Sequence, residues 1–257
     1  MIPEKRRQKI INKLKERNIE TLDKLTEELG VSRVTIQRDV NLLEKEGLLS
    51  RVHGGVKINS EGFNHFESRF QNRLSQNYVK KLEIAKKGLG FVYDESTIFL
   101  DSSTTVYIFF KELAKQKFID LNIITTSPAI LCEALKYPDL KVISTGGELR
   151  AGFNMLCGSW VLEFLDKVNI DASFISAAGI SGEHMLTTSN KELANILAKI
   201  FKRSRNMNLL ADSSKFYKTG MLNISSIGEC GRVVTDGQID RSIATKLKDL
   251  YNLEIVF

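Results

Sequence analysis

The sequence predicts two unequal domains, a small helical domain with a β-hairpin followed by a larger α/β domain with a largely parallel sheet. With 257 residues, the chain is longer than most single domains and long enough for two. Apolar residues recur at helical spacing in the first quarter, whereas short β-branched runs alternate with helical stretches farther on. We place the first domain at residues 1–57, a polar linker at 58–78 and the second domain at 79–257.

The composition is that of a globular protein, because hydrophobic residues make up 42% of the chain and charged residues 26%. The formal net charge is +6, and basic residues concentrate in the first quarter, which is therefore the candidate anion-binding surface. No apolar stretch reaches the roughly 18 residues of a spanning helix, and the N-terminus lacks a signal-peptide core. We therefore expect a cytoplasmic protein.

The first domain is predicted to contain three helices and a hairpin, at residues 4–17, 21–30, 32–47 and 48–56. Thr21 is a good N-cap for the short second helix, and Gly30 is suited to the left-handed position that ends it. Ser32 is placed to cap the third helix after a turn of only a few residues. This order of elements is typical of a helix-turn-helix followed by a small wing.

In a helix-turn-helix, the second helix lies in the major groove and its first side chains contact base edges. The outward residues of this third helix of the chain suit that task, since arginine pairs with guanine and glutamine or asparagine with adenine. They are Arg33, Thr35, Gln37, Arg38 and Asn41. Arg51 and His53 on the wing, with Lys5, Arg6 and Arg7 at the N-terminus, are expected to contact phosphates. The alternative is an ordinary polar helix face with internal ion pairs.

Six apolar runs in the second domain predict the strands of its sheet: Thr97–Leu100, Leu121–Ile124, Lys141–Ile143, Ala172–Ile175, Met207–Leu210 and Val233–Thr235. Small polar residues follow several of them, at the edge where open α/β sheets bind ligands. The run from 101 to 105 also precedes a helix, whose N-terminus favours a phosphate, although a plain helix cap is the alternative. The candidate ligand residues are Asp101, Ser102, Ser103, Thr104, Thr105, Thr126, Ser127, Gly146, Gly147, Gly179 and Lys215.

Nothing in the sequence predicts a metal, a cofactor or a catalytic residue. The three histidines are far apart, the three cysteines form no paired motif, and no G-x-S-x-G elbow is present. The carboxylates at strand ends are not spaced as a catalytic dyad. Trp160 lies in an apolar segment and is expected to pack internally or against another subunit.

Two sets of residues resemble a known family. Residues 31–49, with Arg51-Val52-His53-Gly54-Gly55 after them, closely resemble the DNA-binding signature of the DeoR family of sugar-metabolism repressors. The strand-end residues of the second domain resemble that family's sensor domain, which is similar in fold to ribose-phosphate isomerases and coenzyme A transferases. The resemblance implies a winged-helix transcriptional repressor of a sugar-utilisation operon that binds double-stranded operator DNA. It also implies a phosphorylated sugar as effector, and a homo-oligomer, either a dimer or a tetramer.

The sequence departs from the family at several positions. Gln37 stands where the family often has arginine, and Leu197 stands where lysine is usual. The family's Gly-Ala-Asp-Gly-Ile is replaced by Ser176-Ala177-Ala178-Gly179-Ile180, which lacks the acidic residue. One alternative is therefore a regulator whose sensor no longer binds ligand. The other is a sugar-phosphate isomerase-like enzyme with an appended DNA-binding domain, although isomerisation needs a general base that Ala178 cannot supply.

Overall fold

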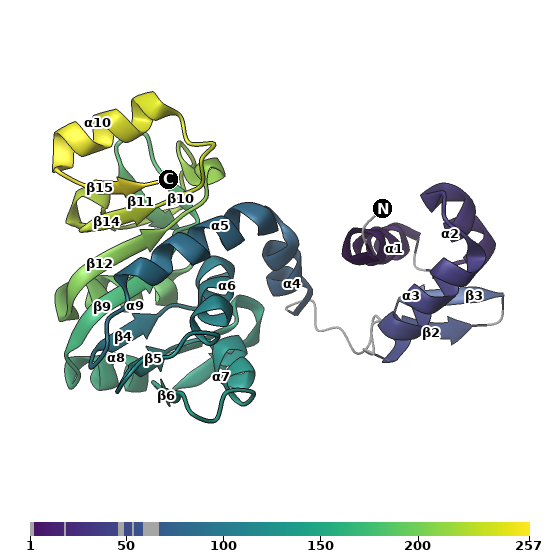
Figure 1. The fold of residues 1–257 in the computed structure, drawn as a ribbon, viewed down its shortest axis with the longest axis horizontal. Helices are drawn as coiled ribbons and strands as arrows, with labels where there is room; N and C mark the ends of the chain where they lie inside the picture. Colours follow the sequence, from purple (N-terminus) through teal and green to yellow (C-terminus); the bar gives the residue numbers. More distant parts are fainter. Residues whose placement is uncertain (1–2, 18, 46–48, 53, 59–66) are drawn as a thin grey trace. The chain divides into compact units, whose positions relative to one another are not determined.

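The computed structural model describes residues 3–17, 19–45, 49–52, 54–58 and 67–257. The chain divides into two compact units, residues 1–68 and residues 69–257, which are drawn in Figure 1. Within the described residues, no helix is long and apolar enough to cross a membrane.

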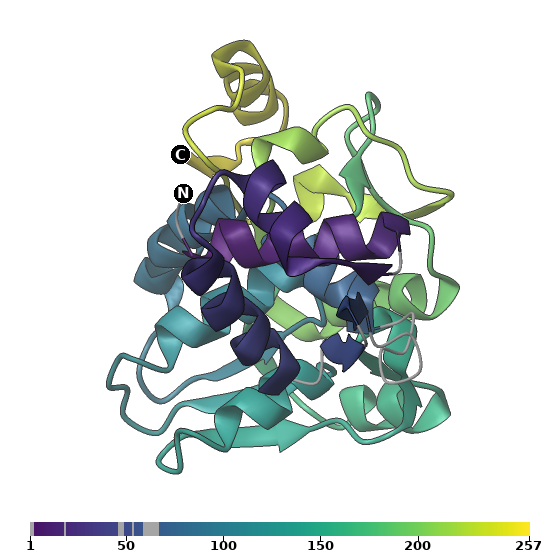
Figure 2. The same cartoon turned by 90° about the vertical axis from the view of Figure 1, so that its right-hand side faces the viewer.

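Unit 1, drawn in purple to dark blue in Figure 2, has three helices and a three-stranded antiparallel sheet among its described residues. The elements are α1 (Pro3–Arg17), β1 (Ile19–Glu20), α2 (Leu22–Leu29), α3 (Arg33–Lys45), β2 (Leu49–Val52) and β3 (Gly55–Ile58). Ile10, Leu14, Leu25, Ile36 and Val40 are fully buried and join the helices in one apolar core. The predicted helices and hairpin are confirmed, and the two-residue strand β1, too short for a periodic signal, adds an edge to β3.

The turn between α2 and α3 has the predicted capping chemistry. The Thr21 hydroxyl accepts a hydrogen bond from the backbone N–H of Lys24 at 3.2 Å. Gly30 ends α2 with φ of 62°, a left-handed conformation that glycine adopts without a steric cost. The Ser32 hydroxyl then accepts from the backbone N–H of Thr35 at 3.3 Å and starts α3. These local bonds fix the short turn on which a helix-turn-helix depends.

Unit 2 is built on a seven-stranded parallel sheet in the order β15-β14-β12-β9-β4-β5-β6. The strands are β4 (Thr97–Leu100), β5 (Asn122–Thr125), β6 (Lys141–Ser144), β9 (Ile170–Ile175), β12 (Ser204–Leu210), β14 (Arg232–Val234) and β15 (Glu254–Val256). All six predicted runs are strands of this sheet. The seventh, β15, lies beside β14 and was not predicted from the sequence.

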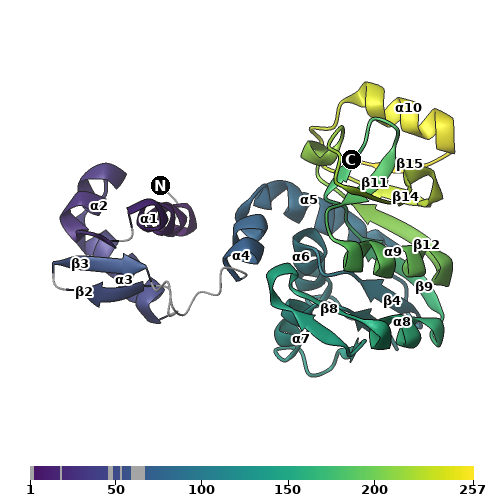
Figure 3. The same cartoon turned by 180° about the vertical axis from the view of Figure 1, so that it is seen from behind.

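Helices cover both faces of the sheet, as Figures 1 and 3 show. They are α5 (Tyr78–Gly88), α6 (Thr104–Leu113) and α7 (Pro128–Ala134) on one face, and α8 (Ser159–Asp166), α9 (Lys191–Arg203) and α10 (Arg241–Tyr251) on the other. Alternate residues of β4 point to opposite faces, since Phe99 packs with the α8, α9 and α10 side while Ile98 and Leu100 pack with the α5 and α6 side. The predicted α/β architecture is therefore a three-layer sandwich.

Smaller antiparallel elements decorate the parallel sheet. The strands β7 (Glu148–Arg150) and β8 (Met155–Cys157) form a hairpin around a single 3₁₀ turn at Ala151–Phe153. A second sheet has the order β10-β11-β13, with β10 (Gly179–Ile180), β11 (Met185–Thr188) and β13 (Leu222–Ser226). The hairpin follows β6 and the second sheet begins after β9, so both start at the carboxyl ends of strands of the parallel sheet.

The segment expected to be a linker, residues 58–78, is partly helical. Residues 59–66 lie outside the described residues, but α4 spans Glu67–Ser75. Phe70 of α4 is buried and packs edge-on against Tyr107 of α6, with ring centroids 5.7 Å apart. Tyr107 lies 37 positions from Phe70 in the sequence, so the polar composition of residues 58–78 could not predict this contact or the helix that depends on it.

Replacing Ile36 by alanine should lower the free energy of unfolding of unit 1 by about 2–4 kcal/mol, because the side chain is fully buried in its core. Val34, on the same helix, is 73% exposed, so Val34→Ala should change stability by less than about 0.5 kcal/mol. Urea unfolding followed by circular dichroism measures both values. Equal losses in the two variants would contradict this arrangement of α3.

Candidate functional site

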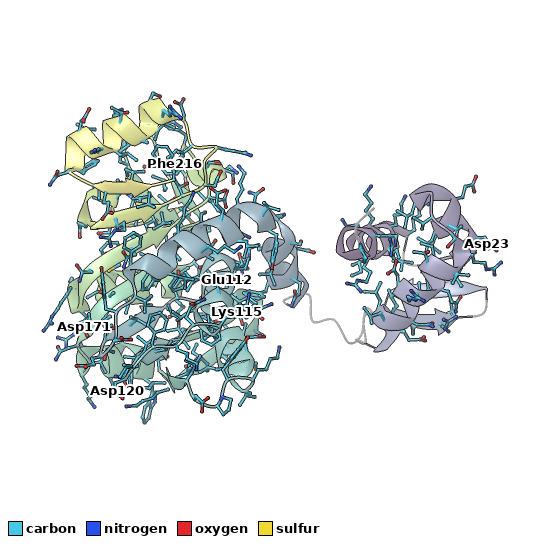
Figure 4. The ribbon with its side chains drawn as sticks, viewed as in Figure 1. Asp23, Glu112, Lys115, Asp120, Asp171 and Phe216 are labelled. Carbon is cyan, nitrogen blue, oxygen red and sulfur yellow. The ribbon has the colours of Figure 1, made fainter. Side chains whose placement is uncertain are left out.

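The outward face of α3 carries most of the residues predicted to contact bases. These residues differ in the hydrogen bonds that they form within the protein. Arg33 forms an ion pair with Asp23 of α2 at 2.9 Å, in which both side chains are mostly exposed. Figure 4 shows Asp23 extending from α2 at the surface of unit 1. The Thr35 hydroxyl lies 2.8 Å from the Ser32 hydroxyl and belongs to the helix cap. Arg38 is exposed and forms no ion pair among the described residues.

The hairpin is joined to α3 through Arg51. Its guanidinium donates to Glu44 at 3.1 Å and to the side-chain oxygen of Asn41. With its amide oxygen turned toward the same guanidinium, Gln37 accepts from Arg51 at 2.7 Å. Gln37, Asn41 and Arg51 therefore lie together, whereas His53 falls outside the described residues.

Arg6 has a different environment from the one expected of a phosphate contact. It is buried and donates a hydrogen bond to Asp39, which is also buried. The ion pair joins α1 to the inner side of α3. Arg6 therefore helps to hold the helix orientation on which base contacts would depend.

The parallel sheet of unit 2 has its topological switch point between β4 and β9, because the chain proceeds from β4 toward β6 on one side and from β9 toward β15 on the other. Ligands of open α/β sheets bind at the carboxyl ends of the strands at such a point. Asp101 follows β4 here and is 1% exposed. One of its carboxylate oxygens accepts from the Ser103 N–H and the other from the Ser176 N–H, each at 2.8 Å.

Burial raises the pKa of Asp101 to about 6, from an ordinary value of 3.8. The hydrogen bonds from Ser103 and Ser176, and the nearby charge of Arg73, oppose that rise because each favours the carboxylate. Both oxygens already accept backbone N–H groups. Asp101 is therefore a clamp between the loops after β4 and β9.

The helix α6 begins beside this clamp. Ser103 is its N-cap and accepts from the Val106 N–H at 3.2 Å, so one of the four consecutive hydroxyl residues has a structural role. Thr104 is buried, and its hydroxyl accepts from the Lys81 ammonium at 3.0 Å. The first N–H groups of a helix have no partner within it and carry a partial positive charge. Ser102, Thr104 and Thr105 thus surround a helix end suited to an anion.

A second cluster lies after β12. One oxygen of the buried Asp212 accepts from the Asn77 amide and from the Ser214 N–H, both at 3.1 Å. Its other oxygen has no hydrogen-bond partner among the described residues. Burial lowers the pKa of Lys215, and the Asp212 carboxylate partly offsets the effect. Phe216 next to Lys215 is buried, which anchors the loop (Figure 4).

The loop after β14 completes this edge of the sheet. The buried Asp236 accepts from the Ser213 N–H at 2.7 Å and from its hydroxyl at 3.0 Å. Lys80 of α5 lies 3.5 Å from the same carboxylate and donates to Ser213 at 2.7 Å. Burial opposes the ionised form of Asp236, but these hydrogen bonds and the Lys80 charge lower its pKa overall. The start of α5 is thereby bound to the loops after β12 and β14.

Two of the predicted residues after β5 and β6, Ser127 and Gly147, have structural roles. Ser127 is the N-cap of α7 and also accepts from the Asn154 amide at 3.0 Å. Thr126 is buried, and its hydroxyl has no partner within the described residues. Gly147 has φ of 102°, and a Cβ there would lie 2.5 Å from the carbonyl oxygen of Cys157, so only glycine fits. Gly146 also has a positive φ. The β7–β8 hairpin covers this part of the edge.

Gly179, the last of the predicted ligand residues, is required by a close approach of two backbones. A Cβ on Gly179 would lie 2.2 Å from the carbonyl oxygen of Lys218. The buried Thr187 hydroxyl donates to the Gly179 carbonyl at 2.9 Å and accepts from the Gly220 N–H at 2.8 Å. The glycine therefore fixes the fold of the β10–β11 hairpin.

An open pocket of about 320 Å³ is lined, in the described part of the chain, by Asn72 and Arg73 of α4 and by Gly152 and Phe153 of the β7–β8 hairpin. Arg73 is close enough to Asp101, Lys81 and Lys215 to influence the pKa of each. Three cations and the positive end of α6 therefore lie around the switch point. No group of three or more metal-ligating side chains occurs among the residues that the structure describes.

Sequence reasoning missed Arg73 and Lys81. Lys81 did carry a signal, because it shares the buried stripe of α5 with Ile84, Ala85 and Gly88. A lysine at an apolar position of an amphipathic helix needs a polar partner inside the protein. Its partner, Thr104, lies 23 positions away and could not be named from the sequence pattern.

Both units match known sequence families. Residues 6–62 match the DeoR-like helix-turn-helix domain, and residues 76–237 match the DeoR C terminal sensor domain. The chain belongs to the DeoR family of transcriptional regulators. The membership of this family that residues 31–49 and the strand ends of unit 2 predicted is thus confirmed.

Named DeoR-like relatives are similar over nearly their whole length. The L-fucose operon activator of Escherichia coli is 30% identical over 94% of this chain and 97% of its own. The regulator GolR of Listeria innocua is 31% identical over 97% and 96%, and the glycerol-3-phosphate regulon repressor of E. coli is 28% identical over 93% of both. All three relatives are named as regulators. A ribose 5-phosphate isomerase A from Methanocaldococcus jannaschii matches 55% of each chain with TM-score 0.41 and 19% identity.

The carboxyl group of Asp101 should titrate near pH 6, and Asp101→Asn should remove that transition from a carbon-detected NMR titration. The folded state holds this proton more tightly than the unfolded chain, so the group's contribution to stability is complete below pH 3.8 and is lost as the pH rises through about 6. Asp240→Asn is the control, because Asp240 is exposed and its pKa is lowered by its hydrogen bonds to Ser242. A spectrum in which Asp101 titrates below about pH 4.5 would contradict this assignment.

Proposed function

We propose that this DeoR-family regulator is a repressor of a sugar-utilisation operon and that a phosphorylated sugar bound to unit 2 changes its affinity for operator DNA. The observation that carries the proposal is the group of cations, Arg73, Lys81 and Lys215, around the N-terminus of α6 at the switch point of the sheet. A phosphate suits both the helix end and these charges. The predicted residues from Asp101 to Thr105 and Lys215 form this proposed site.

The DNA-binding half of the proposal rests on the outward face of α3. Arg38 has no competing ion pair among the described residues, and Arg33 has only an exposed one, which contributes at most about 1 kcal/mol. Both side chains are therefore available to base edges in a major groove. The predicted partners Gln37, Asn41 and Arg51 complete the same surface, with His53 retained from the sequence prediction.

We further propose that the protein acts as a homo-oligomer, a dimer or a tetramer, in the cytoplasm. Two winged helices on repeated half-sites would match the symmetry of the operator. The relatives include one protein named as an activator and one named as a repressor. We favour repression because it requires only that the protein occupy the operator. The effector must favour one state of the protein over the other, by 1–3 kcal/mol in typical systems, for the response to be useful.

The enzyme alternative is weakened by the surroundings of Asp101. A general base must be free to take a proton from its substrate, but both Asp101 oxygens accept backbone N–H groups. Leu197, which replaces a usual lysine, is fully buried in the apolar cluster beneath the sheet. The presence of leucine instead of lysine at position 197 therefore leaves the polar residues around Thr104 intact. This weighs against the alternative of a regulator whose sensor no longer binds ligand.

Fluorescence anisotropy with DNA from upstream of the protein's own gene tests the whole proposal. Selective binding that one of a panel of sugar phosphates alters would support it, with scrambled DNA as the control. Selective binding that no compound alters would overturn the effector half. Binding without selectivity, together with conversion of a sugar phosphate, would favour the enzyme.

Arg38→Ala should weaken operator binding by about 1–3 kcal/mol and relax the preference at one base pair. The matched control is Arg241→Ala, since Arg241 is an exposed arginine at the start of α10 in unit 2. Anisotropy on the operator and on variants of it measures both quantities. An equal loss on operator and random DNA would instead make Arg38 a phosphate contact.

Thr104→Val should abolish the response to the sugar phosphate, because it removes a buried hydroxyl at the start of α6, and should leave operator binding without effector unchanged. The control is Thr97→Val, the same substitution at the first residue of β4. Calorimetry measures effector binding and anisotropy measures the response. An unaltered response in Thr104→Val would refute the assignment of the loop from Ser102 to Thr105.

A further inference from the structure

Lys81 is a buried lysine whose hydrogen bonds join two separate elements. Its side chain, on the inner stripe of α5, is part of a residue only 4% exposed. The ammonium donates to the Thr104 hydroxyl at 3.0 Å and to the backbone carbonyl of Arg73. An ammonium has three N–H donors, so one of them has no partner among the described residues. A buried, unused donor of this kind marks a place for an acceptor.

The two partners of Lys81 belong to elements with different tasks. Thr104 is the first residue of α6, at the helix end to which the effector's phosphate is assigned. Arg73 lies in the last turn of α4, whose carbonyl groups have no partner within the helix. The cation of Lys81 satisfies one of these carbonyls and interacts favourably with the negative end of the helix.

The helix α4 is also the first described element after β3 of the winged-helix unit. It begins at Glu67, and the division between the two units falls after Ser68. Its contact with α6 is the edge-on packing of Phe70 on Tyr107, together with the bonds of Lys81. Arg73 lines an open pocket with Asn72, Gly152 and Phe153, and its charge acts on Asp101 after β4, so the end of α4 lies near the switch point.

Burial lowers the pKa of Lys81 to about 8, with the Asp212 carboxylate opposing that effect. The group is therefore mostly charged at pH 7. A cation in this position gains most from an anionic acceptor, because charge-assisted hydrogen bonds are about twice as strong as neutral ones.

We propose that Lys81 is a positioning residue that transmits the binding of an oxyanion at the start of α6 to the last turn of α4. The oxyanion accepts the third N–H of Lys81, and the ammonium, now held by three partners, orders the Arg73 carbonyl and the turn around it. The effector thereby changes the helix through which the chain enters unit 2. This inference rests on the proposed effector site, and it adds the route by which that site is connected to the DNA-binding unit.

Hydrogen–deuterium exchange on the full-length protein tests the route, with amides of residues 70–77 as the readout. Lys81→Met should speed exchange in the last turn of α4 about tenfold even without a ligand, because a hydrogen bond to a charged group is lost. Lys86→Met is the matched control, since Lys86 lies on the exposed side of the same helix, and it should leave exchange unchanged. Lys81→Arg, which keeps a cation and donors, should recover part of the protection and shows that the Met variant has not merely misfolded.

The second arm adds inorganic phosphate or ribose 5-phosphate, with binding measured separately by calorimetry. In the wild-type protein, a probe that binds should slow exchange in α4, and in Lys81→Met the same probe should leave α4 unchanged. Binding to the wild type without any change in α4, or unaltered α4 exchange in Lys81→Met, overturns the route and leaves the effector site standing. Failure of every probe to bind overturns the effector site and the route together.

Discussion

The architecture of the sensor unit depends on one buried carboxylate at the switch point of its sheet. Asp101 accepts N–H groups from the loop that starts α6 and from the loop after β9, and so holds the two central strands' loops at a fixed separation. Without that acceptor, the half-buried Ser103 N–H and the buried Ser176 N–H would lose their partner, and an unsatisfied buried N–H costs about 1–3 kcal/mol. The carboxylate is itself disfavoured by burial, as its raised pKa shows.

Positive charge near the clamp follows from the same constraint. A buried carboxylate needs cations or donors nearby, and Arg73, Lys81 and Lys215 supply the field around it and around Asp212. The three cations lie near the N-terminus of α6, which itself carries a partial positive charge. The arrangement that stabilises the loops therefore also favours an anionic ligand, and one set of residues can serve both the fold and sensing.

The sequence pattern predicted what depends on local spacing and missed what depends on distant contacts. Six strands were predicted because β-branched runs such as Thr97–Leu100 are bounded by turns. The helix α4 was not predicted, because its buried residue Phe70 packs against Tyr107 across the fold. The strand-end loops were likewise found as a group. Their division into Ser103 and Ser127 as helix caps, and Thr104 as a partner of Lys81, needs the third dimension. A short polar motif at a strand end can be either a helix cap or part of a ligand site, and only its neighbours in the fold distinguish the two.

The same reasoning applies to the winged helix, where polar residues on one face serve either DNA or the protein itself. Arg6 and Asp39 are buried together, so they stabilise the packing of α1 on α3 and are removed from the surface. Arg33 with Asp23 and Arg51 with Glu44 are exposed pairs, and such pairs contribute little to stability. A bidentate contact with a guanine edge contributes about 1–3 kcal/mol to base discrimination, which is more than an exposed ion pair contributes to stability. The exposed pairs therefore leave the Arg33 and Arg51 side chains free to exchange partners, as the proposed DNA contacts require, whereas Arg6 and Asp39 are committed to the fold.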